Sequence, residues 1–512
     1  MRERDAGSTA GVLALPGKAA RLVDGADSAD SAARLGRWPP QAWVAIGLAL
    51  FAAVWLTHLA HASLVPPVDD IEQLLWVRSL EWGYYKHPPL PTWLIWLPVQ
   101  VFGLSAWTAY ALGAICTLGA MALLWRLLAR VRGSTHASVA LLAVLCITYY
   151  NGRLYYFNHN SVLLLLSTLC AVLCWQAFST RRLRWWLALG LALGLGALAK
   201  YQIAVTVLSM LAFLVHQRAW RDPFHRRGAL LAGLVALIVF APHIGWLHAH
   251  DFAPIRYAVE SSLGAKLGAT DRVVASLGWL LDQVFNRALP ALIVLAVAAR
   301  SLPAQPVAPR GDAARSLLLA WGGVPLLFMT LMGIAAGADL QLQWGTPFLL
   351  FAVPAAMELR PRLAWQRANV PRLLKAFIVI QGLLLVLSHL SSPLGPLALR
   401  DRHWRAFDSA QLAERIAEPA RAALGGPIRV VIGATGPAGA LALRLPEHPP
   451  VLIDGRFDRS PWIDADLMRR CGALQLGPVR TTAGATPVGP DFPDLAWRIV
   501  PRELGAAPCP AG

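Results

Sequence analysis

Long apolar runs separated by short arginine-rich segments recur along most of this chain, and they constrain its fold more than any other feature. A helix that crosses a bilayer needs about 20 mostly apolar residues. Runs approaching this length lie near residues 43–60, 106–125, 137–150, 161–178, 183–199, 202–216, 229–247, 279–299, 316–337, 344–357 and 374–390. A content of 56% hydrophobic and 15% charged residues is also too apolar for a soluble protein. The sequence therefore predicts an α-helical polytopic membrane protein with about 11 transmembrane helices.

The basic residues predict the orientation of these helices. Lys and Arg outnumber Asp and Glu by 46 to 29, and the excess falls in every second loop, as it does in cytoplasmic loops. The clusters lie within residues 126–132, 181–184, 218–227, 300–315 and 360–372. We therefore expect a multi-pass protein of the cell inner membrane with a cytoplasmic N-terminus. Because the number of crossings is odd, the C-terminal segment is expected in the periplasm. A basic charge with this distribution serves orientation, so no nucleic-acid partner is expected.

Composition divides the chain into three parts. Residues 1–40 are rich in Ala, Asp, Ser and Arg without periodicity, which predicts a disordered cytoplasmic leader. Residues 41–392 form the predicted transmembrane domain, in which residues 62–105 are the first periplasmic loop. Residues 393–512 are less apolar and predict a small periplasmic α/β domain.

Local patterns support the α/β prediction. Strands are predicted over residues 428–432 and 451–454, and a short helix over residues 460–471. The glycine-rich segment 433–439 follows the first predicted strand, but its spacing is not that of a dinucleotide-binding motif, so we predict a turn there.

The cysteines fall into two groups. Four lie inside apolar runs, where a thiol acts as a small hydrophobic side chain, and no spacing is typical of a zinc site. Cys471 and Cys509 lie in the predicted outer domain, where an oxidising compartment permits pairing. We therefore predict a disulfide between them.

The first outer loop carries the most informative polar residues. Its apolar positions 71, 74, 75 and 82, with Trp76 and Trp82 as interfacial anchors, predict an amphipathic helix on the membrane surface. Asp69 and Asp70 begin this helix. Two interpretations are open: the acids cap the helix, or one of them is a general base for a lipid-linked substrate.

Lys86 and His87 precede the paired prolines Pro88 and Pro89. Two prolines fix an extended backbone, so both basic side chains are held on a defined loop at headgroup depth. Such a loop suits a lipid phosphate. The alternative is unselective contact with anionic headgroups.

These residues resemble the first-loop signature of family 39-type bacterial glycosyltransferases. The signature is an acidic pair followed by a segment like Trp82-Gly83-Tyr84-Tyr85-Lys86-His87-Pro88-Pro89-Leu90. Further matches are Phe157-Asn158-His159-Asn160-Ser161, Leu198-Ala199-Lys200-Tyr201 and Gln343-Trp344-Gly345-Thr346-Pro347. The family belongs to the GT-C class, as do the lipid A aminoarabinose transferases and the protein O-mannosyltransferases. The resemblance implies a donor sugar carried on a polyprenyl phosphate and used at the outer face.

Three departures from the family pattern stand out. The second acid is Asp70 where Glu is usual, residues 71–73 replace a commonly Tyr-rich run, and Gln343 stands where many relatives have His. They leave the class intact but do not specify the sugar.

The resemblance also assigns roles to residues outside the first loop. Donor-phosphate contacts are expected from Lys86, His87, Lys200 and Arg256, and substrate contacts from Tyr84, Tyr85, Asn158, His159, Tyr201, Gln343 and Trp344. Lys200 lies at the outer turn of a predicted hairpin, on the side of Asp69. Blander alternatives remain: Lys200 snorkels at a span end, Arg256 is a solvated loop charge, and His159 is a hydrogen-bonded interfacial side chain.

The sequence thus predicts a membrane glycosyltransferase that transfers one sugar, with inversion, to lipid A or another lipopolysaccharide part, a glycolipid or a protein. Asp69 or Asp70 would take the acceptor proton and basic side chains would stabilise the leaving phosphate. No cofactor is expected, and a divalent metal is left open. The alternatives are a lipid-linked-sugar transporter or flippase, and a non-catalytic subunit of envelope assembly.

Overall fold

The structure, a computed structural model, describes residues 39–263, 267–306, 312–396, 403–480, 482 and 484–510. The chain divides into two compact units, Met1–Leu50 and Phe51–Gly512. Within the described residues the first unit holds little more than the beginning of helix α2 (Pro40–His61), and the architecture below is that of the second unit. The predicted leader over residues 1–40 lies almost wholly outside the described residues.

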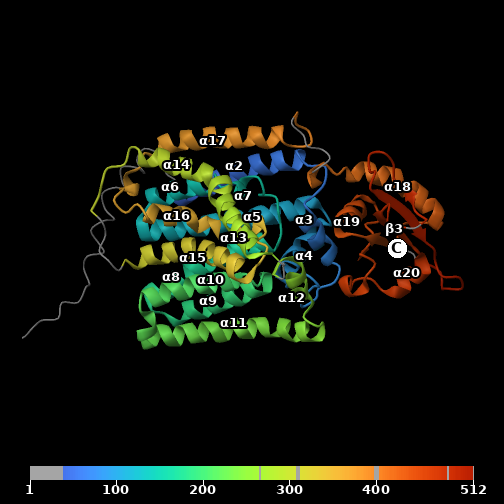
Figure 1. The fold of residues 1–512 in the computed structure, drawn as a ribbon, viewed down its shortest axis with the longest axis horizontal. Helices are drawn as coiled ribbons and strands as arrows, with labels where there is room; N and C mark the ends of the chain where they lie inside the picture. Colours follow the sequence, from blue (N-terminus) through green and yellow to red (C-terminus); the bar gives the residue numbers. More distant parts are fainter. Residues whose placement is uncertain are drawn as a thin grey trace, which may run out of the picture. The chain divides into compact units, whose positions relative to one another are not determined.

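Most of the second unit is a body of apolar helices (Figure 1). They are α5 (Ala106–Arg132), α6 (Ser134–Val144), α7 (Thr148–Asn151), α8 (His159–Thr180), α9 (Leu183–Ala199), α10 (Ile203–His216), α11 (Pro223–Ala249), α12 (Ala253–Ala258), α13 (Ala269–Leu281), α14 (Leu289–Ala299), α15 (Ala313–Ala336), α16 (Ala352–Glu358) and α17 (Val370–Leu390). Short 3₁₀ or π turns join them: η1 (Ala219–Arg221), η2 (Val259–Leu263), η3 (Asp282–Arg287), η4 (Leu342–Gly345), η5 (Leu349–Phe351) and η6 (Trp365–Arg367).

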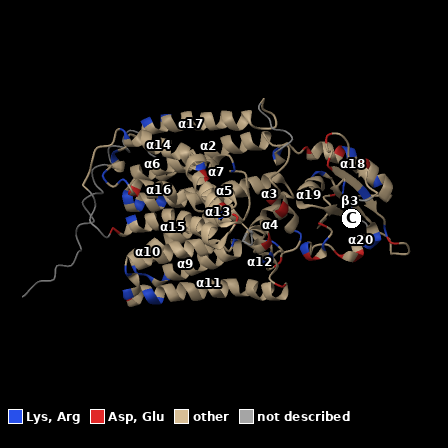
Figure 2. Cartoon of the chain, viewed as in Figure 1, with Lys and Arg blue, Asp and Glu red and all other residues tan. Residues whose placement is uncertain are grey.

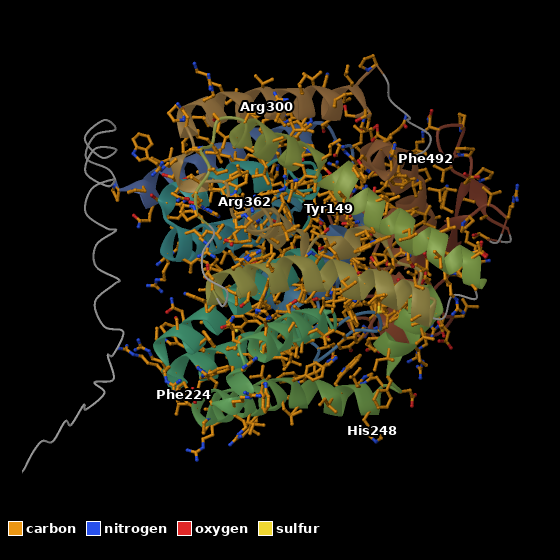
Figure 3. The ribbon with its side chains drawn as sticks, turned by 60° about the vertical axis from the view of Figure 1, so that its left-hand side comes forward. Tyr149, Phe224, His248, Arg300, Arg362 and Phe492 are labelled. Carbon is orange, nitrogen blue, oxygen red and sulfur yellow. A yellow bond between two sulfur atoms is a disulfide. The ribbon has the colours of Figure 1, made fainter. Side chains whose placement is uncertain are left out.

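Six of the described helices are long and apolar enough to cross a membrane: α2, α5, α8, α11, α15 and α17. Figure 3 labels residues near both ends of one of them, Phe224 and His248 of α11. The segment from α13 through η3 to α14 bends by 55° and makes a seventh if it is one span. The other predicted runs coincide with shorter apolar helices, α6, α9, α10 and η5–α16. Helices therefore form at every predicted run, whereas the count of about 11 crossings stays a prediction.

The charges are unevenly distributed along the helical body. Figure 2 shows Lys and Arg gathered at the left-hand end of the helices, whereas the C-terminal sheet lies at the opposite end. Two of these cations are linked to acids: Arg181 to Asp222, and Arg132 to Glu358 and Asp312. This one-sided distribution is what the positive-inside rule expects of a cytoplasmic face.

The loop after α2, predicted to be the first outer loop, contains two short helices, α3 (Val68–Trp76) and α4 (Leu90–Phe102). The apolar face of helix α3 packs against protein. Its residues Ile71 and Trp76 are fully buried, and they belong to one hydrophobic core with Leu441 of the C-terminal domain. The prediction that Trp76 anchors this helix in the interface is therefore wrong, because the C-terminal domain covers the apolar face that was expected to meet lipid. The position of α3 at the membrane surface stays a prediction. Trp82 is 47% exposed, in keeping with an interfacial position.

The C-terminal part is a small α/β domain. Its helices are α18 (Ser409–Leu424), α19 (Thr435–Arg444) and α20 (Ala465–Cys471), its 3₁₀ turns are η8 (Trp404–Ala406) and η9 (Phe457–Arg459), and its strands are β1 (Val431–Gly433), β2 (Val451–Ile453), β3 (Ala473–Pro478), β4 (Thr486–Pro487) and β5 (Leu495–Val500). The sheet order is β2-β1-β3-β5-β4. Strand β1 pairs in parallel with β2 and β3, whereas β5 is antiparallel to β3 and β4. Both strands predicted from the sequence are present, and the predicted helix begins later, at Ala465, after the capping side chain of Asp464.

The glycine-rich segment after β1 opens helix α19, so the predicted turn is wrong. A Cβ atom on Gly439 would lie 2.4 Å from the side chain of Ile71, and one on Gly436 would lie 3.1 Å from the ring of Trp404. Gly439 is needed because α19 packs closely against α3, and Gly436 because α19 packs closely against Trp404. Neither glycine lies at a reversal of the chain.

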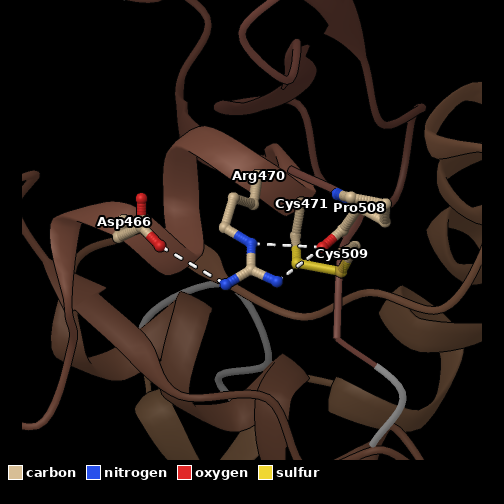
Figure 4. The surroundings of a disulfide bond; sticks show 5 residues. All are labelled: Asp466, Arg470, Cys471, Pro508 and Cys509. Atoms are coloured by element: carbon tan, nitrogen blue, oxygen red, sulfur yellow. Dashed lines mark hydrogen bonds and ion pairs between the residues drawn. A yellow bond between two sulfur atoms is a disulfide. The ribbon is translucent and has the colours of Figure 1, made fainter. Parts of the chain in front are cut away.

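The predicted disulfide joins Cys471, at the end of α20, to Cys509 (Figure 4). Beside it the guanidinium of Arg470 donates to the carbonyl of Pro508, with an Nη2–O distance of 2.7 Å, and contacts Asp466. The end of the chain is thus attached to the sheet domain by a covalent bond and by hydrogen bonds.

Candidate active site

Asp69 and Asp70 link α3 to the start of α8. The side-chain amide of Asn158 donates to Asp69, with an Nδ2–Oδ2 distance of 3.0 Å. The backbone N–H of Phe157 donates to Asp70, with an N–Oδ1 distance of 2.9 Å. Neither acid makes a side-chain capping hydrogen bond to α3. The capping interpretation is therefore wrong in its hydrogen-bonding form, and both carboxylates serve contacts between helices.

The two acids have different environments. Asp70 is fully buried, and its Oδ2 has no hydrogen-bond partner among the described residues. Burial raises the pKa of Asp70 well above its usual range, although the Phe157 N–H opposes the shift. Asp69 is only partly buried. Asp69 is therefore the acid that a substrate can reach, and Asp70 is an internal anchor.

Lys86 forms an ion pair with Glu72, with Nζ–Oε distances of 3.2 and 3.3 Å. Glu72 is 3% exposed and Lys86 is 20% exposed. Burial lowers the pKa of Lys86, but the charges of Glu72 and Asp69 outweigh it, and the net shift is upward. Lys86 is therefore a fixed cation whose charge is already shared with an internal carboxylate.

Lys200 lies in the turn between α9 and α10 and reaches the same region. Its ammonium donates to the side-chain oxygen of Asn160, with an Nζ–Oδ1 distance of 2.7 Å, and lies 5.9 Å from the ring centroid of Trp344. Burial lowers the pKa of Lys200 to about 8. A lysine that snorkels into solvent would lack this burial and these partners, so the snorkelling alternative is not supported.

Two histidine rings lie next to the lysines. The centroids of His87 and His159 are 3.9 Å apart, and Trp76 contacts His159 edge-on. Burial lowers the pKa of His87 well below its usual range. His87 is therefore a neutral ring near pH 7, able to hydrogen-bond to a phosphate but not to pair with it as a cation.

The loop after α11 contacts the site through Tyr257 and not through Arg256. The ammonium of Lys86 lies 5.6 Å from the Tyr257 ring centroid, and Tyr85 meets the same ring at 6.2 Å. Arg256 is exposed and donates to the carbonyl of Asp251. Its assignment as a phosphate contact remains a prediction. Glu260 is exposed in the same loop, and Lys266 lies outside the described residues.

The aromatic residues of the signature motif serve different purposes. Tyr84 stacks on Trp76, with ring centroids 4.4 Å apart, and its hydroxyl donates to the carbonyl of Ser79 at 2.7 Å. Tyr84 therefore stabilises the loop itself. The guanidinium carbon of Arg459, from the C-terminal domain, lies 4.9 Å from the ring centroid of Tyr85.

Tyr201 is bound through a histidine to the first loop. Its hydroxyl lies 2.8 Å from His243 Nε2, and His243 Nδ1 lies 2.6 Å from the carbonyl of Trp82. This chain of hydrogen bonds fixes the turn that carries Lys200 against the first outer loop.

A small pocket opens beside these groups. Asn158 and Asn160 line it and connect it to Asp69 and Lys200, respectively. Gln343 and Thr346 line the pocket from η4 and the residue after it, together with Arg153. Of the residues predicted to bind substrate, Asn158 and Gln343 therefore border a shared space.

Sequence reasoning gave no binding role to Glu72, Asn160, Tyr257 or Arg153. Glu72 lies three residues after Asp69, so both occupy one face of α3. Asn160 lies within a motif that carried the resemblance. Arg153 follows the apolar run 137–150 and lies outside the five basic clusters, which is the signal that could have pointed to it. Within the described ranges, no group of three or more His, Cys, Asp or Glu side chains is arranged to hold a metal ion.

The helical body and the appended α/β domain together have the same fold as a solved membrane protein. ArnT from Cupriavidus metallidurans has this fold in its apo state, with a TM-score of 0.62 and 16% sequence identity. The same protein bound to undecaprenyl phosphate gives a TM-score of 0.61 and 17% identity. Both likenesses cover 90% of this chain and 98% of that chain.

Sequence comparisons point to the same class. The model of the family described as dolichyl-phosphate-mannose-protein mannosyltransferase matches residues 86–246. The lipopolysaccharide core galacturonosyltransferase RgtA of Rhizobium johnstonii is 24% identical over 434 residues, covering 79% of this chain and 81% of that protein. The lipid A galacturonosyltransferase RgtD of the same organism is 25% identical over 236 residues, covering 44% and 47%. The resemblance to GT-C glycosyltransferases related to lipid A-modifying enzymes is thereby confirmed.

Proposed function

We propose that this protein is an inner-membrane glycosyltransferase that moves a sugar from a polyprenyl-phosphate donor to lipid A or the lipopolysaccharide core. The observation that carries the proposal is one cluster that combines a partly exposed carboxylate, Asp69, with two partly buried lysines, Lys86 and Lys200. Relatives that act on lipopolysaccharide, and a relative of known structure bound to undecaprenyl phosphate, support the choice of donor and acceptor.

In the proposed reaction the acceptor hydroxyl attacks the anomeric carbon of the donor sugar. Asp69 takes the hydroxyl proton as the new C–O bond forms. The bond between the anomeric carbon and the phosphate oxygen breaks, and the polyprenyl phosphate leaves with the electron pair. A single displacement of this kind inverts the anomeric configuration.

The lysines would stabilise the charge that develops on the leaving phosphate. Lys200 has only a neutral partner, Asn160, and can give its full charge to a phosphate. Lys86 is held by Glu72, so a phosphate must compete with that carboxylate. His87 would contribute a hydrogen bond, and Arg256 remains a further candidate from the loop after α11.

The proposal includes an orientation. Helix α3, which carries Asp69 and Glu72, lies beside the C-terminal domain, at the end of the helical body opposite its basic end (Figure 2). With that basic end in the cytoplasm, the site and the C-terminal domain face the periplasm. The Cys471–Cys509 disulfide supports this side, because disulfides persist in oxidising compartments.

The test is turnover by the purified full chain with a radiolabelled polyprenyl-phosphate sugar and lipopolysaccharide lacking the added sugar. The proposal expects label in the acceptor and free polyprenyl phosphate in equal amounts, and loss of both with Asp69→Asn. Movement of intact donor across vesicles without transfer would instead identify a flippase. Neither transfer nor movement would favour a non-catalytic subunit.

A further inference from the structure

The pocket beside Asp69 has an unusual charge. Its polar lining consists mainly of neutral amides and hydroxyls, such as Asn158, Asn160 and Gln343. Arg153 is the charged side chain that lines it, and no carboxylate does. A neutral lining suits the hydroxyls of a sugar, whereas a single cation calls for one anionic group on the same ligand.

Arg153 is held in place by aromatic rings and not by an acid. Its guanidinium carbon lies 5.7 Å from the ring centroid of Tyr149 and 5.4 Å from that of Tyr156. Tyr149, labelled in Figure 3, is itself only 2% exposed. Stacking of this kind orients the planar guanidinium without consuming its N–H donors.

Two other partly buried arginines of the helical body have acidic partners. The guanidinium carbon of Arg287 lies 4.9 Å from the ring centroid of Tyr149, and this arginine pairs with Asp282 at 3.0 Å. Arg132 pairs with Glu358 at 2.7 Å. Arg153 has no such partner among the described residues. A partly buried, oriented and unpaired guanidinium is suited to bind a carboxylate through two parallel hydrogen bonds.

We propose that Arg153 binds the carboxylate of the transferred sugar and selects a hexuronate donor. This inference rests on the proposed function and deepens it. Asn158 joins the pocket to Asp69, and Asn160 joins it to Lys200. A hexuronate with its carboxylate on Arg153 therefore has its ring hydroxyls among the amides and its anomeric carbon toward the base and the phosphate-binding lysines. An amino sugar would need a carboxylate where this pocket has a cation.

Arg153 could instead bind the phosphate of the donor. Donors that differ only in the group at sugar carbon 6 distinguish a sugar carboxylate from this phosphate. Polyprenyl-phosphate galacturonate, its methyl ester and polyprenyl-phosphate galactose carry the same phosphate and differ only in the group at sugar carbon 6. With the wild-type chain we expect transfer from the uronate to exceed transfer from the ester and the galactoside by about 10- to 100-fold, the usual worth of hydrogen bonds to a charged group.

Arg153→Gln should lower uronate transfer by about the same 10- to 100-fold factor and leave galactosyl transfer within about twofold. Arg153→Lys should retain part of the preference, because it keeps the charge but loses the planar fork. Arg184→Gln is the matched control: this exposed arginine stacks on Trp185 at the other end of α9, away from Lys200.

Several outcomes would overturn the inference. Equal losses with all three donors in Arg153→Gln would assign Arg153 to the phosphate or to pocket structure. Equal wild-type use of uronate, ester and galactoside would leave the proposed function standing and refute the selection. The comparison of the uronate donor with its methyl ester uses wild-type protein. It therefore tests the selection of a carboxylate even if the Arg153 variants misfold. If neither these three donors nor an aminopentosyl donor gave any transfer, the proposed function itself would be refuted.

Discussion

The carboxylate of Asp69 accepts a hydrogen bond from the side-chain amide of Asn158, 89 residues later in the chain, at 3.0 Å. Asn158 is also the N-cap of α8, where its side-chain oxygen accepts from the N–H groups of Asn160 and Ser161. One amide therefore both begins a long apolar helix and orients the candidate base. Because Asn158 donates to only one Asp69 oxygen, the other oxygen is left for an acceptor hydroxyl.

Asp69→Asn should lower sugar transfer at least about a hundredfold, because an amide cannot take the acceptor proton. Donor binding and expression in membranes should be retained. The measurement is single-turnover transfer together with equilibrium binding of the donor. Wild-type transfer by this variant would move the search for a base to Glu72 or Glu260.

Asp70→Asn is the matched control for that experiment. Burial raises the pKa of Asp70, so its carboxyl is already inclined to the neutral form, and an Asn oxygen can still accept from the Phe157 N–H. We expect transfer within about threefold of wild type, since proton transfer is not affected. Asp70→Ala should instead reduce thermal stability, because it leaves that N–H unpaired.

Donor affinity should depend on the ionisation of Glu72. Burial, opposed by Lys86, raises the pKa of Glu72 to about 6. As the pH falls through 6, Glu72 gains a proton and releases Lys86, whose own pKa is raised and which stays charged. The donor is a phosphate diester and keeps its charge over this range. Donor affinity measured from pH 7.5 to 5.5 should therefore increase by up to about tenfold, the equivalent of one pKa unit.

Glu72→Gln removes the competing carboxylate and should abolish this pH dependence. The variant should bind the donor at pH 7.5 about as tightly as wild type does at pH 5.5. Weaker binding by Glu72→Gln would show that the ion pair positions Lys86 for the phosphate and does not compete with it.

Donor binding should also weaken above pH 8, because burial lowers the pKa of Lys200 to about 8 and the ammonium loses its charge above that value. The KM for the donor should rise several-fold between pH 7.5 and 9.5. Lys200→Arg keeps its charge and should show a flat profile, whereas Lys200→Ala should have a high KM throughout. A steep rise in the Lys200→Arg variant would assign the effect to another group.

The Cys471–Cys509 disulfide should protect both thiols from alkylation in unreduced protein. Closing 38 residues into a loop is worth up to about 4 kcal/mol through the unfolded state. Cys471→Ala with Cys509→Ala should therefore lower the melting temperature of the C-terminal domain, and transfer should persist below that temperature. Free alkylation of both thiols would show that the bond does not form in the cell.

A periplasm-specific reporter fused after Gly512 should be active, since an odd number of crossings follows from the alternating arginine clusters. A reporter that is active only in the cytoplasm, fused at the same position, is the control. Activity of the cytoplasmic reporter alone would mean that one of the short helices α6, α9, α10 or α16 does not cross.

The sequence by itself determined the helices and the class. Apolar runs are local, and in a bilayer every backbone group must be satisfied within its own helix, so length and composition suffice to locate them. The signature around Lys86 and the two cysteines of the C-terminal domain are equally local patterns, and both the resemblance and the disulfide are confirmed.

Only the tertiary structure decided what those polar residues contact. The period of α3 indicates an apolar face but not what covers it, and the C-terminal sheet domain covers it instead of lipid. Asp69 and Asp70 are adjacent in sequence, yet one meets Asn158 and the other the Phe157 N–H. Burial, and with it the ionisation of Asp70, Glu72 and Lys200, depends on chain segments far apart in sequence. Desolvation is a property of the packed surroundings, so no local pattern specifies it.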